Sequence, residues 1–216
     1  MRTGRPRGFC VEDTLDRAMT VFWRHGYEGA SMSDLTAAMG INSPSLYACF
    51  GNKEGLFRAV LERYDERRKI FMENVIAAPT AADVADLFLH GVAEFAVDTS
   101  GQNPPGCLLV QSGLSCADSD IPDELARHRA EKEEALRGRF EKALKSGDLP
   151  QETSPAALAR YLMTVSNGIC VQAASGASAK ELHEVAAMAL MGWPGAGGKA
   201  AMPKSKAAAN TVSDGL

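Results

Sequence analysis

The sequence predicts an all-α protein of about nine helices, on three observations. Apolar residues recur at helical spacing along nearly the whole chain. No convincing run alternates apolar and polar residues, and Asn-Gly or Asp-Gly hairpin turns are missing between β-rich runs. With 216 residues, 45% of them hydrophobic and 23% charged, the chain has ordinary globular composition and is long enough to bury a core without disulfides.

Several classes of protein are excluded at this stage. No stretch approaches the roughly 18 consecutive apolar residues of a membrane span, and the basic first ten residues lack the apolar region of a secretory signal. The five cysteines are odd in number and form no C-x-x-C pair, so a disulfide framework or zinc ribbon is not expected. We therefore expect a cytoplasmic protein without a metal or cofactor and with no membrane partner.

The first two helices are marked by their apolar face and by glycine. Residues 11–25 place five apolar side chains on one helical face, and Gly26 is expected to stop that helix. Ser31 reads as an N-cap with Asp34 three residues later, close to a capping box, and Gly40 ends the short helix that follows.

The next two helices follow from caps and breakers. Asn42 or Ser43 caps a helix over 44–49, with Pro44 in its first turn, where a missing N–H costs nothing. After a break at Gly51, a long helix is expected over 53–76.

The rest of the chain divides at prolines and glycines into further helices. They are expected at 81–98, 106–117, 122–146, 155–175 and 178–192. Residues 194–216 are rich in Gly, Ala, Pro, Lys and Ser, and we expect them to be a disordered tail.

The segment 31–50 is the most informative part of the chain, because two short helices are joined there through a glycine turn. Small polar side chains at the start of the second helix can approach base edges in a major groove, and Lys53 opens a helix whose N-terminus favours a phosphate. The candidate DNA-binding residues in and beside this segment are Ser31, Thr36, Asn42, Ser43, Ser45, Tyr47 and Lys53. The turn alone is equally compatible with an ordinary helical hairpin.

Taken together, this region resembles the N-terminal domain of the TetR/AcrR family of bacterial transcription regulators. The resemblance covers residues 10–65 and rests on FWRHGY at 22–27, Gly40-Ile41, Ser45-Leu46-Tyr47, Phe50, and Lys53-Glu54 with Leu56-Phe57. It implies a three-helix helix-turn-helix domain over 11–67, with the motif at about 30–49. Thr36 stands where the family often has Ala, and Cys49 where it often has His.

The distribution of charge along the chain indicates a basic arm before this domain. Residues 1–70 hold 11 Lys and Arg against 9 Asp and Glu, and residues 71–216 hold 12 against 18. Within the arm, residues 1–10, Arg5 and Arg7 are candidates for contact with DNA backbone or minor groove. The alternative is a solvated tail with no contact.

For residues 68–193 the resemblance implies a helical domain that binds a small effector and forms a homodimer on palindromic operator DNA. We expect the last two helices to form the dimer face, and the effector to be apolar or electrophilic. An effector pocket is expected to be lined by Phe71, Met72, Phe88, Phe95, Leu109, Phe140 and Met163. An apolar stripe of this kind is also what an ordinary core would show.

Cys107 and Cys116 are candidate sensor thiols. Cys107 stands at the start of the helix expected over 106–117, where the helix dipole lowers a thiol pKa. Cys116 lies about 13.5 Å further along that helix, too far for a disulfide between the two. The segment resembles a branch of the family that responds to electrophiles or oxidants, and the alternative is a buried structural thiol.

The functional prediction is a sequence-specific DNA-binding repressor released by a small molecule, and not an enzyme. Two remote alternatives remain at this stage, an effector-independent helical DNA-binding protein and a thiol enzyme. A thiol enzyme needs a base such as His90, His128 or His183, and none has a recognisable sequence relation to Cys107 or Cys116.

Overall fold

A computed structural model describes residues 11–97, 103–113 and 120–194. Those residues form helices and no strands, which confirms the all-α prediction. The helices are α1 (Val11–Gly29), α2 (Met32–Met39), α3 (Ser43–Phe50), α4 (Lys53–Ala77), α5 (Ala81–Ala96), α6 (Leu108–Gly113), α7 (Ile121–Ser146), α8 (Pro155–Ala174) and α9 (Ala179–Leu190). The expected arm with Arg5 and Arg7, the expected tail except for Pro194, and Cys116 lie outside the described residues.

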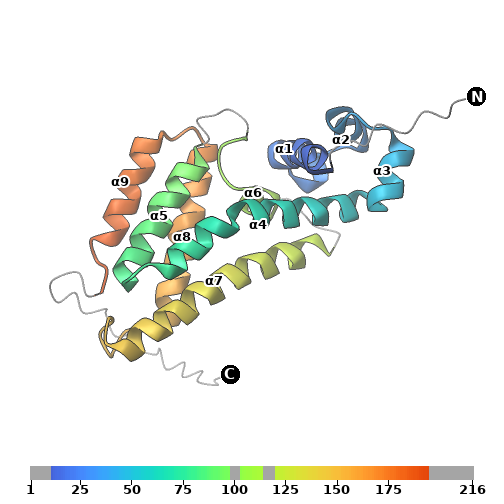
Figure 1. Cartoon of the computed structure of the whole chain (residues 1–216). Coiled ribbons are helices and arrows are strands. Elements are labelled where there is room, and N and C mark those ends of the chain that lie inside the picture. Colours follow the sequence, from blue (N-terminus) through green and yellow to red (C-terminus); the bar gives the residue numbers. More distant parts are fainter. Residues whose placement is uncertain (1–10, 98–102, 114–119, 195–216) are drawn as a thin grey trace, which may run out of the picture.

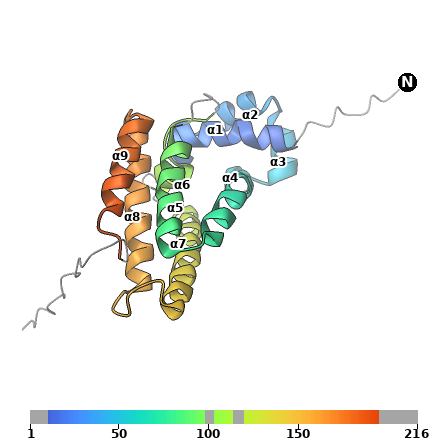
Figure 2. The same ribbon diagram turned by 60° about the vertical axis from the view of Figure 1, so that its left-hand side comes forward.

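The helices form an elongated molecule with α1, α2 and α3 at one end and α5, α8 and α9 at the other (Figure 1). The long helix α4 starts beside α3 and leads into the opposite half, where it packs on α5 (Figure 2). In that half α8 packs on α5, α7 and α9. None of the described helices is long and apolar enough to cross a membrane.

Each end of the molecule has its own cluster of buried side chains. The N-terminal core is built around Phe22, Leu46, Phe57 and Leu61, which are fully buried. The C-terminal core joins buried residues of α5, α7, α8 and α9. The partly buried Cys107 packs against both cores and therefore marks their junction.

The N-terminal core also takes in α6 and the start of α7, which the sequence placed with the second half. Leu108 and Leu109 of α6 and Ile121 and Leu125 of α7 are buried in that core. Helix α6 packs on α1, which in turn packs on α2, one of the two helices joined by the glycine turn.

Most helix ends lie within two residues of the expectation, and two boundaries differ at a glycine. Helix α1 breaks at Gly26, with φ 68° and ψ 175°, but its helical hydrogen bonding resumes to Gly29. Helix α6 begins at Leu108 rather than at Gly106, whose φ of 98° is not helical. The carbonyl of Cys107 accepts the N–H groups of Val110 and Gln111, so Cys107 stands just before the helix.

Candidate nucleic-acid interface

The turn between α2 and α3 has the geometry that the sequence predicted. Ser31 caps α2 by accepting the N–H of Asp34 at 3.0 Å. Gly40 ends the helix with φ 67°, a left-handed conformation that L side chains rarely adopt. The N–H of Ile41 donates to the carbonyl of Thr36 at 3.2 Å, so the chain reverses within a single turn.

Helix α3 is fixed at both ends and anchored in the middle. Asn42 Oδ1 accepts the N–H of Ser45 at 2.8 Å, and the N–H of Gly51 donates to the carbonyl of Tyr47 at 2.9 Å. Leu46, with none of its surface exposed, is the buried residue of α3. Nearly all the remaining surface of this helix therefore faces outward.

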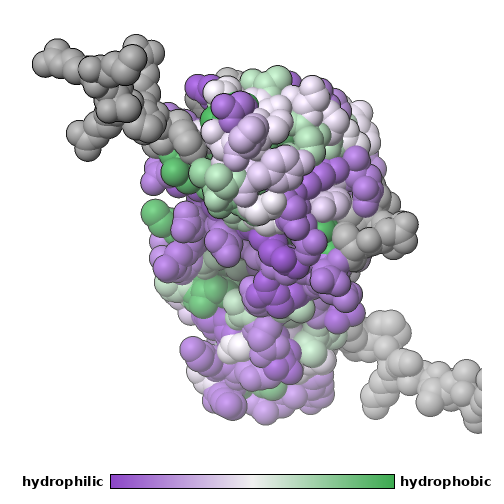
Figure 3. Space-filling model, turned by 90° about the vertical axis from the view of Figure 1, so that its right-hand side faces the viewer, coloured by the Kyte–Doolittle hydropathy of each residue, from purple (hydrophilic) through white to green (hydrophobic). Residues whose placement is uncertain are grey.

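The outward surface of α3 carries short polar side chains and one large ring. Asn42 and Ser43 are exposed, Ser45 is half-buried, and Tyr47 is 50% exposed. Figure 3 views the molecule from the side on which α3 lies, and the upper part of that face is mostly pale, which marks residues of intermediate hydropathy. A helix with this surface fits a DNA major groove, because short side chains leave the base edges accessible.

The start of α4 is held against the end of α3 and against α1. Asn52 Oδ1 accepts the N–H of Gly55 at 2.7 Å, and a Cβ at Gly55 would lie 2.1 Å from the carbonyl oxygen of Phe50. Only glycine permits this approach. The ammonium of Lys53 donates to the carbonyl of Glu28 at 3.3 Å and lies 4.6 Å above the Tyr27 ring. Its position beside the helix N-terminus is therefore fixed, and an ammonium has further N–H groups for a phosphate.

Two of the predicted DNA-binding residues use their hydroxyls within α2. The Thr36 hydroxyl donates to the carbonyl of Met32 at 2.9 Å, and the Ser31 hydroxyl donates to the Asp34 carboxylate at 2.6 Å. That hydrogen bond is also the first cause of the lowered pKa of Asp34. Both residues thus shape the helix that supports α3.

Helix α4 connects this interface with the C-terminal core. Arg63 on α4 forms an ion pair with Asp16 on α1 at 3.2 Å, and the rings of Tyr64 and Trp23 meet edge to face at 5.4 Å. Further along α4, the ring of Phe71 lies 5.0 Å from that of Phe95 on α5. The 25 residues of α4 span about 37 Å at 1.5 Å per residue, so this helix touches both cores.

A thiol cluster lies where the two cores meet. Cys107 Sγ is 3.1 Å from the hydroxyl of Tyr64, and its thiol also shares a hydrogen bond with that of Cys170 on α8. The guanidinium of Arg68 lies 4.6 Å above the Tyr64 ring, and Lys132 of α7 also acts on the thiol. The cluster joins side chains from four separate parts of the chain.

The electrostatics of this cluster favour a thiolate at Cys107. The hydrogen bond from Cys170 lowers the pKa of Cys107 well below its usual value, burial opposes that shift, and the positive charge of Arg68 adds to the lowering. Burial raises the pKa of Tyr64, so its hydroxyl stays protonated beside the sulfur. The sequence predicted a lowered pKa of Cys107 from the helix dipole. In the structure it is lowered by Cys170 and Arg68, which lie far from Cys107 in the sequence.

The predicted pocket residues lie mostly in the C-terminal half, with one exception. Leu109 belongs to the N-terminal core, whereas Phe71, Met72, Phe88, Phe140 and Met163 belong to the C-terminal core or pack against it. The Phe140 ring packs on Trp193 at 5.6 Å, and Phe95 is 44% exposed.

Comparison with known proteins identifies the family. The model of the family described as bacterial regulatory proteins, tetR family, matches residues 15–60. The repressor ComR of Escherichia coli K12 is 35% identical over 203 residues, which cover 88% of this chain and 92% of ComR. The chain belongs to the TetR family. Because ComR and related proteins are transcriptional repressors, this TetR-family chain is a DNA-binding transcriptional repressor.

Solved structures agree with this assignment. A cysteine-substituted CifR, a TetR-family regulator in complex with a 26-base-pair operator duplex, is 37% identical, with a TM-score of 0.82 over 88% of this chain and 100% of that one. A TetR regulator from Rhodococcus sp. RHA1 is 44% identical, with a TM-score of 0.59 over 84% of this chain and 97% of that one. The match to CifR extends the similarity from the glycine turn to 88% of the chain.

TetR-family regulators are dimers, and this chain carries a surface suited to that assembly. Large apolar side chains are exposed on α8 and α9, namely Tyr161, Val171, Val185 and Met188, with Met191 directly after α9. Met188 and Met191 are 68% and 78% exposed, so neither side chain belongs to the core of the subunit. These are the side chains that the expected dimer face on the last two helices would bury.

Proposed function

We propose that this repressor binds a palindromic operator as a homodimer by placing α3 of each subunit in the major groove, in the cytoplasm where the DNA lies. The observation that carries the proposal is the geometry of α3, which is capped at both ends, anchored through Leu46 and otherwise turned outward. Asn42, Ser43 and Ser45 read base edges, and Tyr47 and Lys53 contact phosphates. Ser31 and Thr36 act by holding α2, and Arg5 and Arg7 of the arm add backbone contacts.

Substitution of Tyr47 tests this assignment. Operator duplexes are first selected from random sequences with the wild-type protein, and affinities are then measured by fluorescence anisotropy. Tyr47→Ala weakens binding to operator and to unrelated duplex alike, because a phosphate contact carries no sequence information. Tyr47→Phe separates the hydroxyl from the ring. Undiminished affinity of the alanine variant contradicts a DNA contact at Tyr47.

Release from the operator proceeds, in this proposal, through α4. A ligand moves the equilibrium only if it binds two conformations unequally, and a coupling of about 1–3 kcal/mol is typical. Because α4 packs on α1 at one end and on α5 at the other, a tilt driven from the C-terminal core changes the separation of the two α3 helices in the dimer.

A second candidate for the trigger is covalent modification of Cys107, favoured by the surroundings of its sulfur. A thiolate beside Arg68 attacks an electrophile such as a maleimide, forming a C–S bond, and the resulting carbanion takes a proton from water. The adduct then occupies space between Tyr64 on α4 and Cys170 on α8, and so separates the two cores at their junction.

The thiol candidate is tested with N-ethylmaleimide in a Cys49→Ser background, because the exposed Cys49 on α3 would react at the DNA interface itself. The background protein loses operator affinity on treatment, and the further substitution Cys107→Ser abolishes that loss. If both proteins lose the operator equally, or neither does, Cys107 is structural and the effector is a non-covalent ligand.

A further inference from the structure

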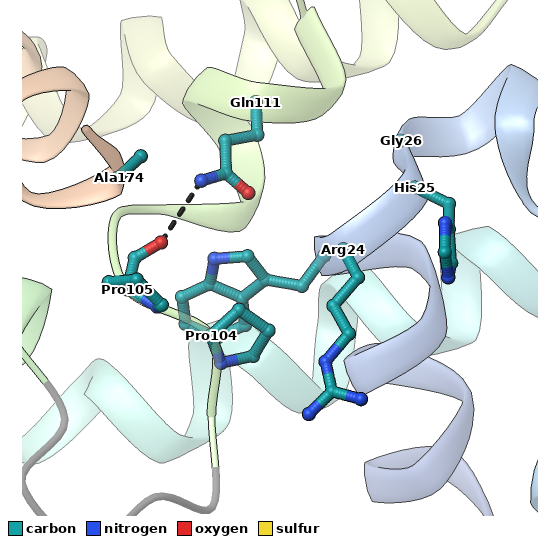
Figure 4. Close-up of a pocket in the computed structure, with 8 residues that line it drawn as sticks. Arg24, His25, Gly26, Pro104, Pro105, Gln111 and Ala174 are labelled. Carbon is teal, nitrogen blue, oxygen red and sulfur yellow. Dashed lines mark hydrogen bonds between the residues drawn. The ribbon is translucent and has the colours of Figure 1, made fainter. Parts of the chain in front are cut away.

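A solvent-open cavity of about 460 Å³ lies between the end of α1 and the segment that leads into α6. Its walls are Trp23, Arg24, His25 and Gly26 of α1, Pro104 and Pro105 before α6, Gln111 of α6, and Ala174 of α8. Figure 4 shows Arg24 and His25 on one side and Pro104, Pro105, Gln111 and Ala174 on the other. None of these residues belongs to the pocket that the sequence predicted.

One wall of this cavity has an unsatisfied donor. Trp23 is 4% exposed, and its indole Nε1 is buried without a hydrogen-bond partner among the described residues. A buried N–H without an acceptor is destabilising, and water does not reach it to compensate. The neighbouring Gln111 directs its amide nitrogen to the carbonyl of Pro105 at 3.0 Å, as the dashed line in Figure 4 marks.

The same wall carries positive charge without a counterion. Arg24 is exposed, and no carboxylate of the described chain lies within ion-pair distance of its guanidinium. Most other arginines on the described helices have such a partner, as Arg63 has in Asp16 and Arg160 in Glu133. A planar guanidinium in this state binds a carboxylate through two parallel hydrogen bonds.

The remaining lining is flat and apolar. The rings of Pro104 and Pro105 and the methyl group of Ala174 offer apolar surfaces against which an aromatic ring packs. An occupant with one planar ring and one anionic group therefore matches both halves of the lining.

We propose that this cavity binds a small aromatic carboxylate, with its carboxylate on Arg24 and its ring against Pro104 and Pro105. The buried indole N–H of Trp23 lies in the wall of this site and reports its occupancy. The inference rests on the proposed control by an effector and names where an effector binds and what chemistry it has.

Occupancy of this site reaches the DNA interface by a short path. Trp23 and Gly26 belong to α1, which packs on α2, whereas Ala174 belongs to α8 in the C-terminal half. Gly26 is also the point at which α1 breaks. A ligand held between these walls fixes the angle between α1 and α8, and with it the position of α3.

The test uses sodium benzoate as the probe and the indole N–H as the reporter. The chain has two tryptophans, so in Trp193→Phe protein the one remaining indole N–H peak in a 15N-correlated NMR spectrum is that of Trp23. Benzoate shifts this peak saturably below about 10 mM, and neutral benzamide does so far less. Arg24→Gln weakens benzoate binding about tenfold, and the matched control Lys145→Gln at the end of α7 leaves it unchanged.

Operator affinity is measured on the same samples. Benzoate weakens operator binding of the parent protein and of Lys145→Gln but not of Arg24→Gln. An unshifted Trp23 peak, or equal benzoate affinity in Arg24→Gln, overturns the binding site. A shifted peak with unchanged operator affinity overturns its role as an effector site. Since operator binding without benzoate is measured in every case, a failure of the DNA-binding proposal is seen separately.

Discussion

The substitution Asn42→Ala separates the structural part of α3 from its contacts with DNA. Asn42 Oδ1 accepts the N–H of Ser45 at 2.8 Å and so satisfies one of the donors that the first turn leaves open. Asn42 is itself exposed, so its side chain contributes little burial to the core. Loss of the cap is therefore the main effect expected on stability.

The magnitude follows from that single hydrogen bond. Replacing an Asn cap by Ala costs about 1 kcal/mol, and α3 has only eight residues, with Leu46 as its buried anchor. A loss of about 1 kcal/mol reduces the ratio of folded to unfolded protein roughly fivefold. Asn42→Asp keeps the cap, because Asp caps about as well as Asn, but places a negative charge where DNA phosphates approach.

Urea unfolding followed by circular dichroism measures the first effect, and fluorescence anisotropy with operator DNA the second. Asn42→Ala loses stability and some affinity, whereas Asn42→Asp keeps its stability and loses affinity more strongly. If Asn42→Asp is destabilised as much as Asn42→Ala, the cap is not what holds α3. If Asn42→Asp binds operator as tightly as wild type, the start of α3 does not face the DNA.

Three further predictions concern other parts of the chain. Gly55→Ala places a Cβ 2.1 Å from the Phe50 carbonyl oxygen and lowers the free energy of unfolding by about 1–3 kcal/mol. The control Gly138→Ala has open space at its Cβ and does not lower it, and equal urea midpoints for the two variants refute the close approach. Arg68→Met removes a cation that stabilises the Cys107 thiolate, so the pKa of the Cys107 thiol rises and its alkylation by iodoacetamide at neutral pH slows. Lys69→Met, which removes an exposed charge one residue later, is the control. An unchanged pH–rate curve in Arg68→Met refutes the role of the guanidinium. Deletion of residues 2–7 lowers the slope of log K against log salt by about 0.9 for each DNA phosphate that the arm neutralises in the intact protein, and an unchanged slope means that the arm neutralises none.

Local features of the fold were predictable from the sequence because they depend on neighbouring residues. The caps Ser31 and Asn42 and the stop at Gly40 each act within a few residues, and the structure has them in the predicted places. The start of α6 was wrong by two residues, since the Gly106 backbone adopts a conformation that apolar spacing does not reveal.

The side chains that contact Cys107 could not be predicted from the sequence, because they lie far from it along the chain. Tyr64 and Arg68 lie about 40 residues before it and Cys170 lies 63 residues after it, and only the packing of α4 and α8 brings them together. For the same reason, the sequence grouped Leu109 with residues that belong to the other core. Apolar spacing places Leu109 on the buried face of a helix but does not state which of two cores that face joins.

The most direct test of the central claim uses the native cysteine on α3. Cys49 is exposed on the helix proposed to enter the major groove. Its alkylation by iodoacetamide is followed by mass spectrometry, with and without a saturating operator duplex selected from random sequences. We expect the operator to slow alkylation of Cys49 strongly, and a random duplex at equal concentration and physiological salt to do so far less. An unchanged rate at Cys49 in protein fully bound to its operator contradicts the assignment of α3 as the DNA-reading helix.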